Sequence, residues 1–185
     1  MTHKVNAALS GLFQDALDRS GQDSFSTSFD PSFRSECELH QQGDNTLWRP
    51  RLQSPPVDFT GLSNAVGSPI HPDVCAYFGS YWAGTLESTS QEGHVSLLQL
   101  WNQEDFDRLI GNLIGHFMAK QKMKQAFTVF FANTEPDSEF FLSIDNESGQ
   151  VLLEEPAKPP LQIVEQDLTT FLKRLTPVTV ATRIY

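Results

Sequence analysis

The feature that most constrains the fold of this chain is one long amphipathic segment with a group of strand-like segments on either side of it. The amphipathic segment repeats apolar side chains at three- and four-residue steps, at Phe106, Leu109, Ile110, Leu113, Ile114, Phe117 and Met118. Such spacing predicts a helix. Asn102 is suited to cap its N-terminus, and the lysines of segment 120–124 stand where it should end.

The segments around this helix alternate apolar and polar residues, as strands do. Before the helix, residues 81–88 and 95–101 predict a hairpin. After it, residues 127–133 predict a central strand, and residues 140–145 and 150–154 flank a turn-type sequence and predict a second hairpin. Hairpins with separate helices predict an α+β fold, in which helices pack on a mainly antiparallel sheet of about five or six strands.

Further helices are expected near both ends of the domain, with one or two helical turns at residues 59–66 and a short helix at about 72–79 between them. Residues 1–20 carry apolar side chains on one face and end before Gly21. A last helix is expected from about Ile163 to Leu175, with Pro177 after it.

The chain length fits one domain over residues 1–177, followed by a C-terminal tail at 178–185. Residues 21–57 are rich in Ser, Asp, Gln and Pro, and are expected to form an irregular connection held by aromatic side chains, with a short strand near Thr46.

Acidic residues are distributed unevenly along the chain. The 185 residues hold 23 acidic and 13 basic side chains, for a net charge of -10. Neither Lys nor Arg occurs between Arg51 and Arg108 or between Lys124 and Lys158, and 14 of the acids lie there. These stretches also contain the predicted main sheet. The charge argues against nucleic acid as a partner and favours a basic one, although solvated acidic turns would give the same pattern.

Several residues of these stretches are candidates for contact with a basic partner. Trp82 is a candidate apolar anchor, although core packing is the commoner fate of a tryptophan. The candidate carboxylates are those of Asp73, Glu87, Glu92, Glu139, Glu154 and Glu155.

The sequence lacks the common catalytic motifs, and we do not expect an enzyme. The sequence has no phosphate-binding glycine loop, nucleophile elbow or His-Glu-x-x-His motif. Cys37 with His40 and His71 with Cys75 have ligand-like spacings, but their order is unusual for zinc, and we favour buried or free thiols. We therefore expect no cofactor, no metal and no catalytic residues. No run of about 20 apolar residues predicts a membrane span.

Several motifs together resemble the Syd family, over about residues 59–177. They are His71-Pro72-Asp73, Tyr77-Phe78-Gly79-Ser80-Tyr81-Trp82-Ala83-Gly84, Leu97-Leu98-Gln99-Leu100-Trp101-Asn102, Asp105-Phe106, Asn112-Leu113-Ile114-Gly115-His116, Thr128-Val129-Phe130-Phe131-Ala132 and Asp145-Asn146. The resemblance implies a fold similar to Smi1/Knr4-like and toxin-immunity proteins.

The resemblance also implies a function. Members of this family bind SecY, the channel of the protein-export translocase, and are thought to regulate or proofread its complexes. It implies a negatively charged concave binding surface and loose, peripheral association with the cytoplasmic side of the inner membrane. Basic cytoplasmic loops of SecY are the expected partner. The alternative is an immunity-type protein that neutralises a basic toxin or nuclease.

Overall fold

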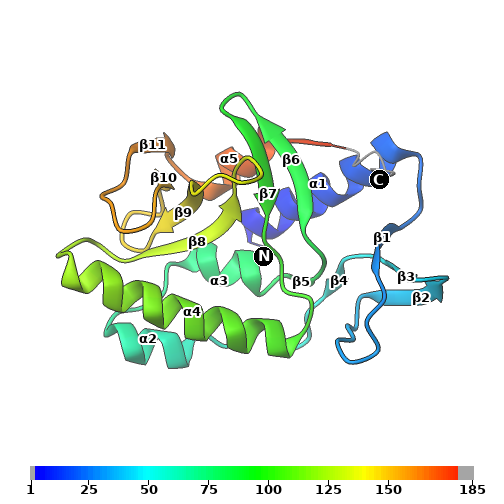
Figure 1. The fold of residues 1–185 in the computed structure, drawn as a ribbon, viewed down its shortest axis with the longest axis horizontal. Helices are drawn as coiled ribbons and strands as arrows, with labels where there is room; N and C mark the ends of the chain where they lie inside the picture. Colours follow the sequence, from blue (N-terminus) through cyan, green and yellow to red (C-terminus); the bar gives the residue numbers. More distant parts are fainter. Residues whose placement is uncertain (1–2, 179–185) are drawn as a thin grey trace.

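The computed structural model describes residues 3–178. Its largest element of regular structure is a seven-stranded sheet in which every neighbouring pair is antiparallel (Figure 1). The strands run in the order β11 (Gln162–Glu165), β10 (Val151–Glu154), β9 (Phe141–Asp145), β8 (Thr128–Asn133), β7 (Gly93–Leu97), β6 (Leu86–Ser90) and β12 (Thr176–Pro177). The α+β class is confirmed, and the main sheet has more strands than the five or six expected.

One face of this sheet is buried against three helices, from the beginning, the middle and the end of the domain. These are α1 (Lys4–Ser20), α3 (Pro72–Phe78) and α5 (Leu168–Lys173), and α1 packs on the other two. On this face Phe131 of β8 contacts the rings of Tyr77 and Phe171 edge-on, at centroid distances of 5.5 and 5.8 Å. All three side chains are fully buried, so they form the centre of the core.

The long helix α4 (Gln103–Lys122) lies against the other face, and α2 (Thr60–Val66) packs on it (Figure 1). Its predicted cap is confirmed, because the Asn102 side chain accepts a hydrogen bond from the Asp105 backbone N–H at 3.0 Å. His116 reaches the Thr128 hydroxyl of β8 at 2.9 Å. This helix covers only part of its face of the sheet, since the side chains of β6 and β7 line an open groove described below.

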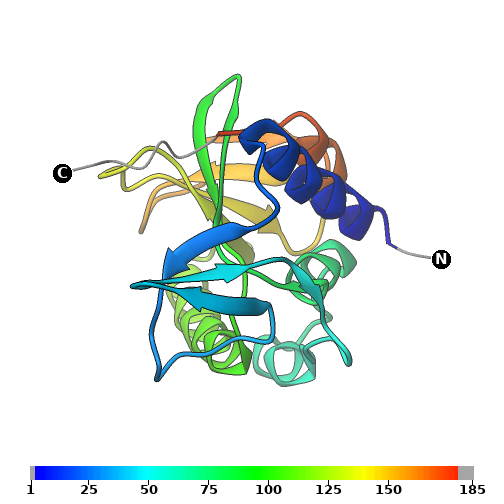
Figure 2. The ribbon, with the colours of Figure 1, turned by 90° about the vertical axis from the view of Figure 1, so that its right-hand side faces the viewer.

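The segment expected as an irregular connection is more ordered than predicted. It forms a three-stranded sheet in the order β1 (Phe25–Ser28), β3 (Asn45–Trp48) and β2 (Glu38–Gln42), set apart from the main sheet (Figure 2). A fourth strand, β4 (Arg51–Leu52), pairs with β5 (Tyr81–Trp82). Trp48 connects this part to the core by meeting Trp101 and Phe13 of α1 edge-on, at 5.9 and 6.4 Å, and within the small sheet it stacks on Phe25 at 4.5 Å.

Two other expectations about the elements are corrected. The segment 81–88 is not one strand, because β5 and β6 belong to different sheets. The last helix begins at Leu168 rather than near Ile163, and the residues before it form the edge strand β11. Asp167 sets this start, since its side chain accepts the Thr170 backbone N–H at 2.8 Å. Of the predicted tail, residues 179–185 lie outside the described part of the chain.

Within residues 3–178, none of the helices has the combination of length and apolar composition needed to cross a bilayer.

Candidate functional site

The uncovered part of the sheet presents polar side chains in register. Glu87 of β6 lies opposite Ser96 of β7, and Ser96 lies opposite Asn133 of β8. Antiparallel partners point to the same side of a sheet. The three side chains therefore form one polar row across three strands, on the side that also carries His94.

This row is the floor of a groove of about 760 Å³, which we call the acidic groove. The loop after β8 forms one side of it and adds the exposed carboxylates of Glu135 and Asp137. Its lining within the described chain includes three carboxylates and neither lysine nor arginine, and consists of Glu87, His94, Ser96, Asn133, Thr134, Glu135, Pro136, Asp137, Ser138 and Val178.

Hydrogen bonds hold two of these carboxylates in place. Glu87 contacts the His94 ring Nε2 at 2.7 Å and accepts the Ser96 hydroxyl at 2.9 Å. Glu135 accepts the His94 backbone N–H at 2.9 Å across the groove. A carboxylate oxygen can accept more than one hydrogen bond, so both groups remain able to accept donors from a ligand. The arrangement suits capture of cations by carboxylates that are already oriented.

A second hollow, the aromatic cavity, adjoins the acidic groove and shares Asn133 and Ser138 with it. It has a volume of about 370 Å³. Its walls include Phe130, Phe140, Phe141 and the His116 ring. Burial lowers the pKa of His116 below its usual value, and nearby Lys120 lowers it further against the opposing effect of Glu154. The imidazole is therefore neutral at neutral pH.

Glu154 is not a surface carboxylate, which corrects its expected role in partner binding. Its side chain is fully buried in the wall of the aromatic cavity, where it pairs with the equally enclosed Lys120 and accepts a hydrogen bond from Ser143. Burial raises the pKa of Glu154, but the hydrogen bonds from Lys120, Ser143 and Thr128 outweigh this and hold the pKa below its usual value. This carboxylate is enclosed within the fold and is not exposed to a macromolecular partner.

Two other predicted carboxylates have cationic partners nearby. Glu92 accepts both terminal nitrogens of Arg174, at 2.7 and 3.0 Å, and this ion pair lowers the pKa of Glu92 to about 2. Glu155 pairs with Lys158 at 2.6 Å. The stretches that lack Lys and Arg in the sequence therefore still contact basic side chains from other parts of the chain. Glu139, by contrast, is exposed at the aromatic cavity and makes no ion pair within residues 3–178.

The last two predicted residues lie elsewhere. Asp73 is in the first turn of α3, 3.5 Å from His3, and α3 is among the helices that cover the opposite face of the sheet. Trp82 is only 8% exposed and belongs to the core. It lines a separate hollow of about 760 Å³ that shares no described lining residue with the acidic groove.

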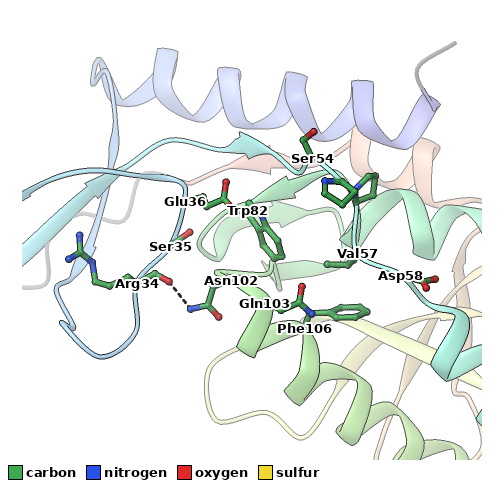
Figure 3. A pocket seen from close by; sticks show the side chains of 12 residues that line it. Arg34, Ser35, Glu36, Ser54, Val57, Asp58, Trp82, Asn102, Gln103 and Phe106 are labelled. Atoms are coloured by element: carbon green, nitrogen blue, oxygen red, sulfur yellow. Dashed lines mark hydrogen bonds between the residues drawn. The ribbon is translucent and has the colours of Figure 1, made fainter.

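Figure 3 shows this Trp82 hollow. The indole lies between the segment around Val57 and the start of α4, where Asn102 donates a hydrogen bond to the Arg34 carbonyl at 2.8 Å. The charged residues around it are Arg34, Glu36 and Asp58. The indole thus forms part of the wall of this hollow and does not project outwards from the surface.

The cysteines and histidines with ligand-like spacing do not form a recognisable metal site. Among the described residues, no group of three or more His, Cys, Asp or Glu side chains is placed to hold a metal ion. Cys37 is buried, and burial raises the pKa of its thiol to about 11. Burial also raises the pKa of Cys75. Both thiols are therefore poor nucleophiles at neutral pH.

The structure adds residues to the candidate site that were not singled out from the sequence. Glu135 and Asp137 belong to the second base-free stretch, but only the pairing of β7 with β8 shows that they face Glu87. His94 and Ser96 carry a weaker signal, namely the period-2 alternation of a strand whose polar side faces a groove.

Comparison with known proteins shows the family to which this chain belongs. The profile of a family described as "Syd protein (SUKH-2)" matches residues 6–177. A protein named Protein Syd from Alteromonas mediterranea is 34% identical over 180 residues, covering 96% of this chain and 99% of the relative. Namesakes from Pseudoalteromonas atlantica and Hahella chejuensis are 33% and 35% identical, with 97% and 95% of this chain covered. The chain belongs to the Syd family.

Proposed function

We propose that this protein binds basic cytoplasmic segments of SecY in its acidic groove, and thereby regulates or proofreads SecY complexes. The observation that carries the proposal is the groove itself. Glu87, Glu135 and Asp137 converge from a strand and a loop on one concavity, and its described lining has no lysine or arginine. Family membership directs the proposal to SecY, the partner that the resemblance implies.

Charge complementarity supports this partner class. Cytoplasmic loops of membrane proteins are enriched in Lys and Arg. A concave surface of one sign raises the rate at which an oppositely charged ligand is captured, by about 10- to 1,000-fold at low salt. The net charge of -10 adds a long-range attraction to the local one. The groove would thus select the basic face of a membrane protein over acidic soluble surfaces.

The energetics favour a reversible complex. An exposed ion pair contributes only about 0–1 kcal/mol, so three carboxylates alone give weak binding. Glu139 on the adjoining cavity extends the acidic surface beyond the groove. Weak, salt-sensitive binding follows from these magnitudes. With SecY as the partner, the association would be peripheral and on the cytoplasmic side of the inner membrane. The proposed role is binding and not catalysis.

Co-sedimentation with inverted inner-membrane vesicles tests the proposal. Vesicles enriched in SecY should retain the protein at low ionic strength, and vesicles depleted of SecY should not. Raising the salt concentration to about 0.5 M should release it, by roughly tenfold or more in affinity, because screening shortens electrostatic attraction to a few ångströms. Equal retention by SecY-depleted vesicles would contradict the choice of partner, and salt-independent retention would contradict the acidic groove.

A further inference from the structure

The aromatic cavity lies beside the acidic groove but has no role in the electrostatic binding proposed above. Phe140 at the cavity is 42% exposed, although it is a large apolar side chain. Deeper in, Phe130 and Phe141 meet the His116 ring edge-on at 5.8 and 6.0 Å and each other at 6.5 Å. These three rings support one another, which gives the cavity a preformed wall.

The interior of the cavity is close to electrically neutral. His116 is uncharged at neutral pH, because burial lowers its pKa. The two buried charges in the wall, Lys120 and Glu154, neutralise each other. A free ion gains little in such an environment, whereas an apolar side chain gains the free energy of leaving water.

The charged residues at the edge of the cavity indicate which side chains should stand next to that apolar side chain in a partner. Glu139 is exposed and makes no ion pair within the described chain, and Glu155 is already paired with Lys158. The shared residues Asn133 and Ser138 connect this edge directly to the acidic groove. A segment that fills the cavity therefore meets the carboxylate of Glu139 at the cavity edge and, beyond the shared residues, the carboxylates of the acidic groove.

We propose that the aromatic cavity receives one bulky apolar side chain of a basic partner segment, while neighbouring lysines or arginines of that segment occupy the acidic groove. This inference rests on the proposed function, since it assigns the sequence pattern that the same binding surface selects. At about 370 Å³ the cavity is at the small end of ligand sites and is large enough for one bulky apolar side chain. A buried anchor surrounded by weaker charged contacts is the usual anatomy of a protein–peptide interface.

The test uses two synthetic peptides of equal charge, one with Phe between flanking lysines and one with Ser in its place. Binding to the full chain is measured by calorimetry at low salt. The Phe peptide should bind about tenfold more tightly than the Ser peptide, as expected for partial burial of one aromatic side chain. Ala119→Trp fills the cavity from an exposed helix position and should abolish this preference while leaving binding of the Ser peptide unchanged.

Phe140→Ala, which removes an exposed wall residue, should reduce the preference in the same direction. Met118→Ala is the matched control, because Met118 is an exposed apolar residue of α4 outside the cavity lining. Thermal unfolding of each variant checks that it folds.

The outcomes separate this inference from the proposed function. Equal binding of the two peptides by the wild-type protein would overturn the inference and leave binding in the acidic groove intact. Binding of neither peptide would overturn the inference as well, and SecY vesicles would then decide the proposed function independently. Self-association of the protein that Ala119→Trp abolishes, without any preference between the peptides, would also overturn it, because the occupant would then be a second copy.

Discussion

Gly84 shows how closely single positions are specified where the small sheet meets the core. A Cβ atom at this position would lie 2.6 Å from Cζ2 of the Trp48 indole. Trp48 is buried among Phe13, Phe25 and Trp101 and has no room to move aside. The sequence motif that contains Gly84 therefore has a packing explanation that does not involve a ligand.

We expect Gly84→Ala to lower the free energy of unfolding by about 1–3 kcal/mol, the usual cost of overpacking. The matched control is Gly111→Ala in α4, where a Cβ atom would meet nothing within 4 Å. That control should raise stability by about 0.5–1 kcal/mol, because glycine is a poor helix former. Urea unfolding of both variants measures the difference, and an equal effect of the two substitutions would contradict the packing argument.

The buried pair of Lys120 and Glu154 gives a second prediction for single residues. Lys120→Met should destabilise the protein by about 3–5 kcal/mol, because it leaves the enclosed Glu154 carboxylate without its cation. The double variant Lys120→Met with Glu154→Gln should recover most of this loss, since the introduced amide carries no charge and its oxygen can still accept the Ser143 hydroxyl. Chemical denaturation measures both. A double variant as unstable as Lys120→Met would show that the charge is not the cause.

The sequence alone indicated which stretches are acidic, but it did not show which basic side chains pair with their carboxylates. Arg174 is 82 positions from Glu92 and still forms a two-point ion pair with it. Lys120 and Glu154, which are 34 positions apart, meet because α4 lies across the strand pair that carries Ser143 and Glu154. Counting charges along the chain therefore locates an acidic region, whereas tertiary contacts decide which of its carboxylates remain free.

At the scale of elements, the Glu92–Arg174 pair ties the tip of the β6–β7 hairpin to the end of α5. The ion pair lowers the pKa of Glu92 from 4.5 to about 2. The unfolded chain binds the proton more readily than the folded protein between these two values. The stabilisation is therefore complete above about pH 4.5 and is lost as the pH falls towards 2.

Glu92→Gln should accordingly lower stability by about 1 kcal/mol at pH 7, a magnitude reduced by the partial exposure of the pair. The difference between wild type and variant should shrink as the pH falls below about 4.5. Urea midpoints measured at several pH values check this. A constant difference down to about pH 3 would mean that the effect of the substitution does not come from the ion pair.

The helices were easier to predict from the sequence than the short strands. The helices α1 and α4 carry long 3.6-residue periods with clear ends, and both appear where expected. The strand β11 has only four residues, and its Ile163 and Val164 also fit the apolar period of the following helix. Three of the four strands in segment 21–57 leave little buried apolar alternation to detect, because their side chains are mostly exposed.

At the scale of the whole molecule, the two faces of the main sheet differ in how far helices cover them. One face is sealed by α1, α3 and α5, and the other is only partly covered by α4. The acidic groove and the aromatic cavity lie side by side on the latter face. Antiparallel register is what brings Glu87 beside the loop after β8, and that register was not specified by the sequence pattern.

The most direct test of the central claim compares two triple variants that lose the same charge. Glu87→Gln, Glu135→Gln and Asp137→Asn together neutralise the acidic groove, whereas Asp18→Asn, Asp23→Asn and Asp44→Asn neutralise exposed carboxylates outside it. Affinity for SecY-containing membrane vesicles is measured for both at low salt. We predict a loss of about tenfold or more for the groove variant and less than about threefold for the control. Equal losses would contradict the account, because net charge rather than the groove would then govern binding.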